Sequence, residues 1–168
     1  MLPELPKMSL LQQRYIEARV VGPLIRAFQR EMGADEAAAV ARRAIQEIAR
    51  ERGRELAQQS ERQDLEAFAE VAKAWRSQGA LTIQVLEQSP TRFDFNVTRC
   101  RFAEMYREMG LADLGSILSC ERDGSLCQGF SQEIALTRTQ TIMQGAPFCD
   151  FRYTYEPGPG NEGGREDT

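Results

Sequence analysis

The sequence predicts an α+β protein, in which an N-terminal helical segment is followed by a ββααββ antiparallel-sheet domain. Two observations support this prediction. Up to residue 79 the apolar side chains recur every three to four residues, as in amphipathic helices, whereas from Leu81 onward they alternate with polar ones, as in strands. We therefore divide the chain into a helical segment (1–79), an α+β domain carrying the site (80–156) and a tail (157–168). The tail is rich in Gly, Pro and charged residues and is expected to be disordered.

Three helices are expected in the N-terminal segment. The first runs from Ser9 to about Met32 and contains Pro23, which should kink or interrupt it because proline cannot donate a backbone hydrogen bond. The second runs over about 35–58 and has a narrow apolar stripe. The third follows Ser60, which could cap it.

Two hairpins with helices between them are expected in the second half. The strands are identified by alternating apolar residues and the turns by Gly, Pro and Ser. In chain order we expect a hairpin from "LTIQVLEQ" (81–88) and "FDFNVTR" (93–99), helices over about 101–109 and 111–128, and a second hairpin from "IALTRTQTIMQ" (134–144) and "FCDFRYTYE" (148–156).

Composition excludes several classes of function. The net charge of −4 argues against a nucleic-acid binder. No apolar run approaches the roughly 20 residues of a membrane span, and no signal peptide is evident, so we expect a cytoplasmic protein. Disulfides are therefore not expected among the four cysteines. The chain has no histidine, which excludes Ser-His-Asp and Cys-His catalysis and His-ligated metal sites.

Cys100 is the first candidate for a chemical role. It lies where a strand is expected to end and a helix to begin, between Arg99 and Arg101. A helix N-terminus and neighbouring cations both favour the thiolate, which is the reactive form of cysteine. The alternative is a small buried apolar residue, which is what most free cysteines are.

Two further cysteines lie near charged residues. Cys120 and Asp123 are three residues apart on one face of a helix, where they could form a proton-transfer pair, or Asp123 could simply end the helix. Cys149 shares the apolar side of its strand with Phe151, which makes core packing its default role. Cys127 has no charged neighbour and is interpreted as structural.

Arg138 and Gln140 interrupt an otherwise apolar row in the strand before Cys149. If this row faces the core, Arg138 must be paired or must bind an anion such as a ligand carboxylate, because an unpaired buried charge is costly. The alternative is that the row is exposed and that the threonines between these residues face inward. Both interpretations remain open from the residues alone.

Several segments resemble the L-2-amino-thiazoline-4-carboxylic acid hydrolase family. They are "VTRCRFAEMYREMGLADLGSILSCERD" and "GFSQEIALTRTQTIMQGAPFCDFRY", with "YIEARVVGPLIRAF" similar to the family's helical lead-in. The resemblance covers about residues 9–155. More distantly, the ββααββ segment is similar to small-molecule-binding domains of the vinyl-4-reductase type.

The resemblance implies a hydrolase that opens a small heterocyclic carboxylate, a thiazoline or cyclic amidine, without a cofactor or a metal. In such a reaction the carboxylate of the substrate would bind an arginine, and Asp123 would pair with the amidine or act as general base. Either a thiol or a water molecule would attack the ring carbon. The candidate catalytic residues are Cys100, Cys120, Asp123 and Cys149, and the candidate substrate-binding residues are Arg99, Arg101, Arg138 and Gln140.

Two other classes of function are kept beside this one. The first is a non-enzymatic sensor or carrier that binds a small molecule or a soft metal through the same thiols. The second is a helical interaction module, with the N-terminal helices forming a homodimer surface, which is compatible with either activity. The expected ligand in every case is a small molecule, with neither nucleic acid nor membrane as a partner.

Overall fold

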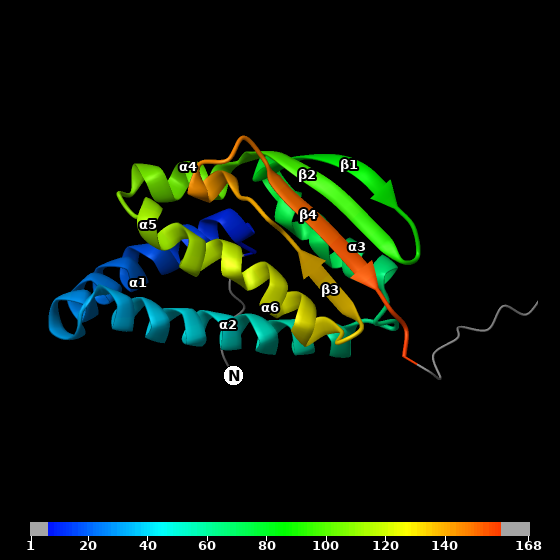
Figure 1. The fold of residues 1–168 in the computed structure, drawn as a ribbon, viewed down its shortest axis with the longest axis horizontal. Coiled ribbons are helices and arrows are strands. Elements are labelled where there is room, and N and C mark those ends of the chain that lie inside the picture. Colours follow the sequence, from blue (N-terminus) through cyan, green and yellow to red (C-terminus); the bar gives the residue numbers. More distant parts are fainter. Residues whose placement is uncertain (1–6, 159–168) are drawn as a thin grey trace, which may run out of the picture.

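The computed structural model describes residues 7–158 and has the expected α+β architecture, with helices packed on one face of a four-stranded antiparallel sheet (Figure 1). The helices are α1 (Leu10–Met32), α2 (Ala34–Gln59), α3 (Leu65–Lys73), α4 (Arg101–Glu108), α5 (Ala112–Gly115) and α6 (Glu121–Phe130). The strands are β1 (Leu81–Gln88), β2 (Arg92–Cys100), β3 (Ile134–Thr137) and β4 (Cys149–Tyr155). Short 3₁₀ segments span Ala74–Gly79 and Ile142–Gln144, and a π-helical segment spans Ser116–Cys120.

The first helix begins as expected but is not interrupted. Ser9 caps α1, because its hydroxyl accepts from Gln12 N at 3.2 Å while Ser9 N donates to Gln12 Oε1 at 2.9 Å. Pro23 lies inside the helix, which continues to Met32, so the expected interruption was wrong. Gly22 and Ile25, close to Pro23 on the same helix, are buried.

The third helix begins later than expected. Asp64, and not Ser60, caps α3, with its carboxylate accepting from Ala67 N at 2.9 Å. Phe68 of α3 packs against Phe130 and Tyr153, with ring centroids 5.5 and 5.1 Å away. Helix α3 therefore shares a hydrophobic core with the sheet, whereas buried residues of α1 pack with those of α4 and α5 in a second cluster.

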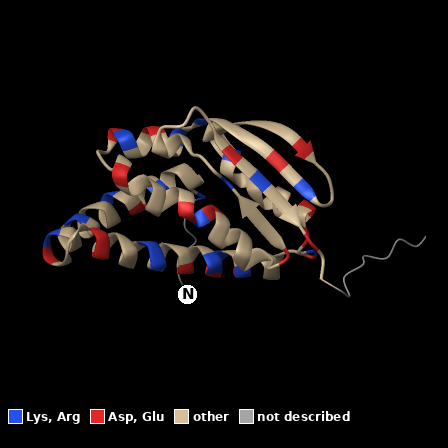
Figure 2. Ribbon diagram, viewed as in Figure 1, with Lys and Arg blue, Asp and Glu red and all other residues tan. Residues whose placement is uncertain are grey.

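The strands lie in the order β1-β2-β4-β3, all antiparallel. The odd-numbered side chains of β2 from Phe93 to Val97 and those of β4 from Cys149 to Tyr153 are buried, and they are paired in register, Phe93 with Tyr153 and Phe95 with Phe151. Charged residues occur at even-numbered positions of both strands, including Asp94, Asp150 and Arg152, and Figure 2 shows charged positions along the strands. The burial of the apolar positions is what the alternating pattern predicts, whereas Asp94 is an exception, because it is buried on the even-numbered side and pairs with Arg92 at 2.7 Å.

The second hairpin is shorter than expected, because residues 138–148 leave the sheet. The carboxylate of Asp150 accepts hydrogen bonds from Thr139 N at 3.0 Å and Gln140 N at 2.8 Å, and from the Thr139 hydroxyl at 2.6 Å. After Thr137, these bonds take the place of the backbone hydrogen bonds between β3 and β4. The segment then forms a 3₁₀ turn and returns to β4 at Cys149.

Two glycines set the position of α6 against α2. A side chain on Gly53 would collide with the backbone of Leu126, and one on Gly129 would collide with the backbone of Arg50. The two helices consequently approach closely along much of their length, as Figure 1 shows. This contact fixes the helix that carries Arg122 and Asp123.

Three expectations are not decided by the fold. Among the described residues, no helix combines the length and apolar character that a membrane crossing requires. α1 exposes apolar side chains at four-residue spacing, including Ile16, Val20 and Leu24, so the homodimer surface stays a prediction, which the mass of the protein in solution tests. The expected tail lies outside the described residues, apart from Pro157 and Gly158.

Candidate functional site

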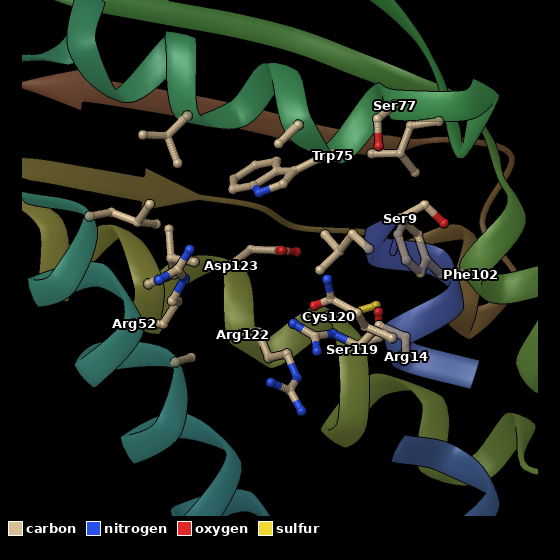
Figure 3. A pocket seen from close by; sticks show the side chains of 18 of the residues that line it. Ser9, Arg14, Arg52, Trp75, Ser77, Phe102, Ser119, Cys120, Arg122 and Asp123 are labelled. Atoms are coloured by element: carbon tan, nitrogen blue, oxygen red, sulfur yellow. The ribbon is translucent and has the colours of Figure 1, made fainter. Parts of the chain in front are cut away.

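A cavity of about 680 Å³ lies between the helices and one end of the sheet. Its wall includes side chains from α1, α2, the 3₁₀ segment after α3, β2, α6 and the start of β4. Figure 3 shows Asp123, Arg122, Arg14 and Cys120 around this hollow, with Trp75 and Phe102 also on its wall. Segments far apart in the sequence thus meet at one site.

Cys100, Cys120 and Cys149 all line this cavity, together with Asp123 and Arg138. The structure thus brings together five of the eight candidate site residues. Cys127 does not line it; it is buried and donates to Ile134 O at 3.3 Å, as expected of a structural cysteine.

Local structure explains how each thiol reaches the cavity. Cys100 is the N-cap of α4, where its sulfur accepts from Ala103 N at 3.4 Å. Cys120 ends the π-helical segment, in which Glu121 N donates to the carbonyl of Ser116, five residues back. Cys149 begins β4 and accepts from Ile142 N at 3.2 Å. π-helical turns are rare and frequently occur at functional sites.

The surroundings of Cys100 oppose the thiolate that its place in the sequence favours, and its chemical role stays a prediction. Burial raises its pKa from 9.0 to about 11, although the Ala103 N–H works in the opposite direction. Burial also raises the pKa of Cys120 and of Cys149. All three cavity thiols are therefore neutral near pH 7.

Arg138 and Asp123 form the most buried ion pair of the cavity. The guanidinium donates to Asp123 Oδ2 at 2.6 Å and to Cys120 O at 2.9 Å, and it lies over the Phe151 ring. Burial raises the pKa of Asp123, and the Arg138 guanidinium counteracts this rise. Of the two interpretations of Arg138, the inward-facing one is confirmed, and its anion is Asp123.

The other three candidate residues lie elsewhere. Arg99 is exposed and pairs with Glu104 at 2.8 Å, and Arg101 is exposed and donates to Gln78 O at 3.3 Å. Gln140 donates its amide to Phe148 O at 3.0 Å, in the loop held by Asp150. None of the three is part of the cavity wall. Charge adjacent to Cys100 in the sequence therefore does not reach its sulfur in space.

Sequence reasoning missed a second charged cluster in the cavity. Glu17 accepts from Arg14 at 2.7 and 2.8 Å and from Arg122 at 3.0 Å, so one carboxylate is shared by two guanidinium groups. Arg122 also donates to Leu118 O at 2.7 Å. The spacing of Arg14 and Glu17 suggests only an ordinary pair on one helix, and nothing in the sequence links them to Arg122.

No metal centre is indicated by the residues of the cavity. Across residues 7–158, no group of three or more His, Cys, Asp or Glu is arranged to hold a metal ion. Binding of a soft metal by the thiols stays a prediction, which the metal content of the purified protein tests.

Comparisons with known proteins place this geometry in context. The family model described as L-2-amino-thiazoline-4-carboxylic acid hydrolase matches residues 13–153, which include every cavity residue discussed above. No curated protein sequence matches the chain significantly. Among solved structures, the phenol-responsive sensory domain of the transcription activator PoxR, crystallised with phenol, aligns at a TM-score of 0.48 and 12% identity, over 92% of this chain and 79% of that chain.

Proposed function

The chain belongs to the L-2-amino-thiazoline-4-carboxylic acid hydrolase family, and from this premise we propose that it is a hydrolase that opens a small heterocyclic carboxylate in the cavity. The expected substrates are thiazolines and related cyclic amidines. The volume of about 680 Å³ lies within the range of about 300–1,000 Å³ that is usual for small-molecule sites.

The charge balance of the cavity supports an anionic substrate. Three arginines of its wall have side chains only 13–16% exposed, namely Arg14, Arg122 and Arg138. They face two carboxylates, Asp123 and the half-exposed Glu17. Among these five side chains one positive charge is in excess, because the remaining charged residues of the wall are exposed to water, and a substrate carboxylate would neutralise it. This excess is the observation that carries the proposal.

The reaction needs a water molecule and a proton acceptor. Water would add to the ring carbon between sulfur and nitrogen, the carbon–sulfur bond would break, and the sulfur would leave as a thiol after gaining a proton. Within residues 7–158, Asp123 is the carboxylate that pairs with Arg138, and the arginine binds its Oδ2. Its other oxygen can accept from the amidine or from the attacking water.

The protonation of the thiols favours water over cysteine as the nucleophile. A neutral thiol is a poor nucleophile, and burial keeps Cys100, Cys120 and Cys149 protonated. In this mechanism the three sulfurs form a polarizable wall for the substrate's own sulfur.

A second candidate function is a non-enzymatic binder of the same small molecules. Two observations favour it. The cavity thiols are neutral and thus not activated as nucleophiles, and Asp123, the candidate general base, is already bound to Arg138. The chemistry of the cavity thus suits binding as well as turnover, and an assay decides between them.

The test is the opening of 2-amino-2-thiazoline-4-carboxylate, followed by the release of free thiol. We expect turnover by the unmodified protein and a loss of about 10²- to 10⁴-fold in Asp123→Asn. Asp113→Asn is the matched control, because this exposed carboxylate pairs with Arg26 outside the cavity. Cys100→Ala is expected to remain active. If this variant is folded but inactive, the result would support Cys100 as a covalent nucleophile. Binding without thiol release would favour the second candidate.

A further inference from the structure

We infer that Arg14 and Arg122, which share Glu17, form the subsite that receives the carboxylate of the ligand. This inference deepens the proposed function by locating anion recognition within the cavity. It rests on that function for one point, the chemical identity of the ligand beyond its carboxylate. The two arginines come from α1 and α6, and both side chains are part of the cavity wall.

Arg138 is less suited to this role, although it is equally buried. Its two terminal nitrogens are already engaged, one with Asp123 at 2.6 Å and the other with Cys120 O at 2.9 Å. A ligand carboxylate near this pair would also meet the negative charge of Asp123. Arg138 therefore neutralises a protein carboxylate and adds no net charge to its end of the cavity.

The Arg14–Glu17–Arg122 cluster has one more positive than negative charge. Burial lowers the pKa of Arg122, and the nearby Arg14 guanidinium lowers it further, as expected of two cations held close together. Glu17 is 42% exposed, whereas the two arginine side chains are 16% and 13% exposed. The cations are thus buried more deeply than their shared partner, and an anion entering the cavity would relieve their repulsion.

The other charged residues of the wall, Glu51, Arg52, Glu55 and Glu70, are all exposed. Arg52 pairs with Glu55, and Glu70 pairs with Lys73, which lies outside the wall. These pairs lie at the rim, where water screens them. The electrostatic preference for an anion is therefore concentrated at Arg14 and Arg122.

The first test compares binding of 2-amino-2-thiazoline-4-carboxylate with binding of 2-amino-2-thiazoline, which lacks the carboxylate. We expect Arg14→Gln and Arg122→Gln to weaken binding of the first compound about 10- to 100-fold, as when a charged hydrogen-bonding partner is removed, and to leave binding of the second unchanged. Glu17→Gln should strengthen binding of the first compound, because it removes the competing carboxylate. Arg26→Gln, an exposed arginine of the same helix paired with Asp113, is the matched control.

The second test does not depend on the substrate. Trp75 is the single tryptophan of the chain and lies on the cavity wall, so its fluorescence reports what enters. We expect the ratio of quenching by iodide to quenching by neutral acrylamide to fall in Arg14→Gln, to rise in Glu17→Gln and to stay constant in Arg26→Gln. Arg14→Gln and Glu17→Gln change an ion pair in which Glu17 is partly exposed. They therefore test the inference even where Arg122→Gln fails to fold.

The two proposals fail in different ways. Equal quenching ratios in all four proteins, together with equal affinities for the carboxylate compound, would overturn the subsite. Tight, Arg14-dependent binding of the carboxylate without release of thiol would instead overturn the hydrolase and leave the subsite in place.

Discussion

The two ends of the covered sheet face differ in how the space above them is filled. At one end, Tyr153 packs against Phe93 of the sheet and Phe68 of α3, and Phe68 packs against Phe130 of α6, with ring centroids 5.1–6.3 Å apart. At the other end, the paired residues are Val97 and Cys149, which are smaller, and the cavity lies above them.

The same register thus produces both a core and a site. Strands β2 and β4 pair continuously from one end to the other, so the backbone does not distinguish the two ends. Side-chain volume does, because protein interiors are close-packed and a missing aromatic ring leaves space that the rigid neighbours cannot close. The packed aromatic end stabilises the fold. The fold therefore tolerates a cavity at the end that carries Cys149.

The largest expected effect is on stability at the packed end. Phe68 is fully buried and contacts the rings of Trp75, Phe130 and Tyr153, so Phe68→Ala should lower the free energy of unfolding by about 3–5 kcal/mol. Denaturation by urea measures this change. A loss below about 1 kcal/mol would mean that the aromatic cluster does not hold the fold and that the contrast between the ends is wrong.

Enlarging a cysteine sharpens the comparison, because the two ends should respond differently. Cys127→Leu adds volume in the packed core and should destabilise the protein by about 1–3 kcal/mol. Cys149→Leu, at the hollow end, should cost less and should instead lower the affinity for 2-amino-2-thiazoline-4-carboxylate, because the added atoms occupy the cavity. Unfolding and binding measured on both variants check this. Equal destabilisation with unchanged affinity would show that the hollow end is closed in solution.

The smallest expected effect concerns pH. Burial raises the pKa of Cys100 from 9.0 to about 11, so the folded state holds this proton more tightly than the unfolded state. The associated stability is fully present below about pH 9 and is lost as the pH rises through about 11. Cys100→Ser, which does not titrate there and can still cap α4, should lose less stability over this interval.

Alkylation of the folded protein tests the same thiols kinetically. Iodoacetamide should modify Cys100 slowly at pH 7 and faster toward pH 11, because only the thiolate reacts. Cys127, at the packed end, also has a pKa raised by burial, to about 12, but it lies outside the cavity and should stay unmodified. Fast labelling of Cys100 at pH 7 would contradict the neutral thiol and favour covalent catalysis.

Much of the fold could be predicted from periodicity. The switch from helical to alternating spacing near Leu81 located the change from helices to sheet, and the alternation in β2 identified its buried face. The errors came from competing hydrogen bonds. The Asp150 carboxylate accepts a hydrogen bond from Thr139 N, so β3 ends earlier than expected. The Asp64 carboxylate, and not the Ser60 hydroxyl, caps α3.

The candidate site was only partly predictable. Short-range patterns placed Cys120 and Asp123 on one helix face, and the interrupted row pointed to Arg138. The influence of Arg99 and Arg101 on Cys100 was inferred from adjacency in the chain, but both side chains turn to other partners. Adjacency sets the direction of a side chain only where the backbone is regular, and the strand-to-helix junction is not.

The sequence by itself determined the element types, the buried face of the sheet, the family resemblance and the identity of the thiols. Tertiary structure alone decided that Arg14 and Glu17 meet Arg122, which follows Glu17 by 105 residues in the chain, and that burial raises the pKa of the thiols. The physical reason is that periodicity is a local property, readable from neighbouring residues. Electrostatic balance and desolvation depend on every group that surrounds an atom, and these groups are assembled only when the helices close over the sheet.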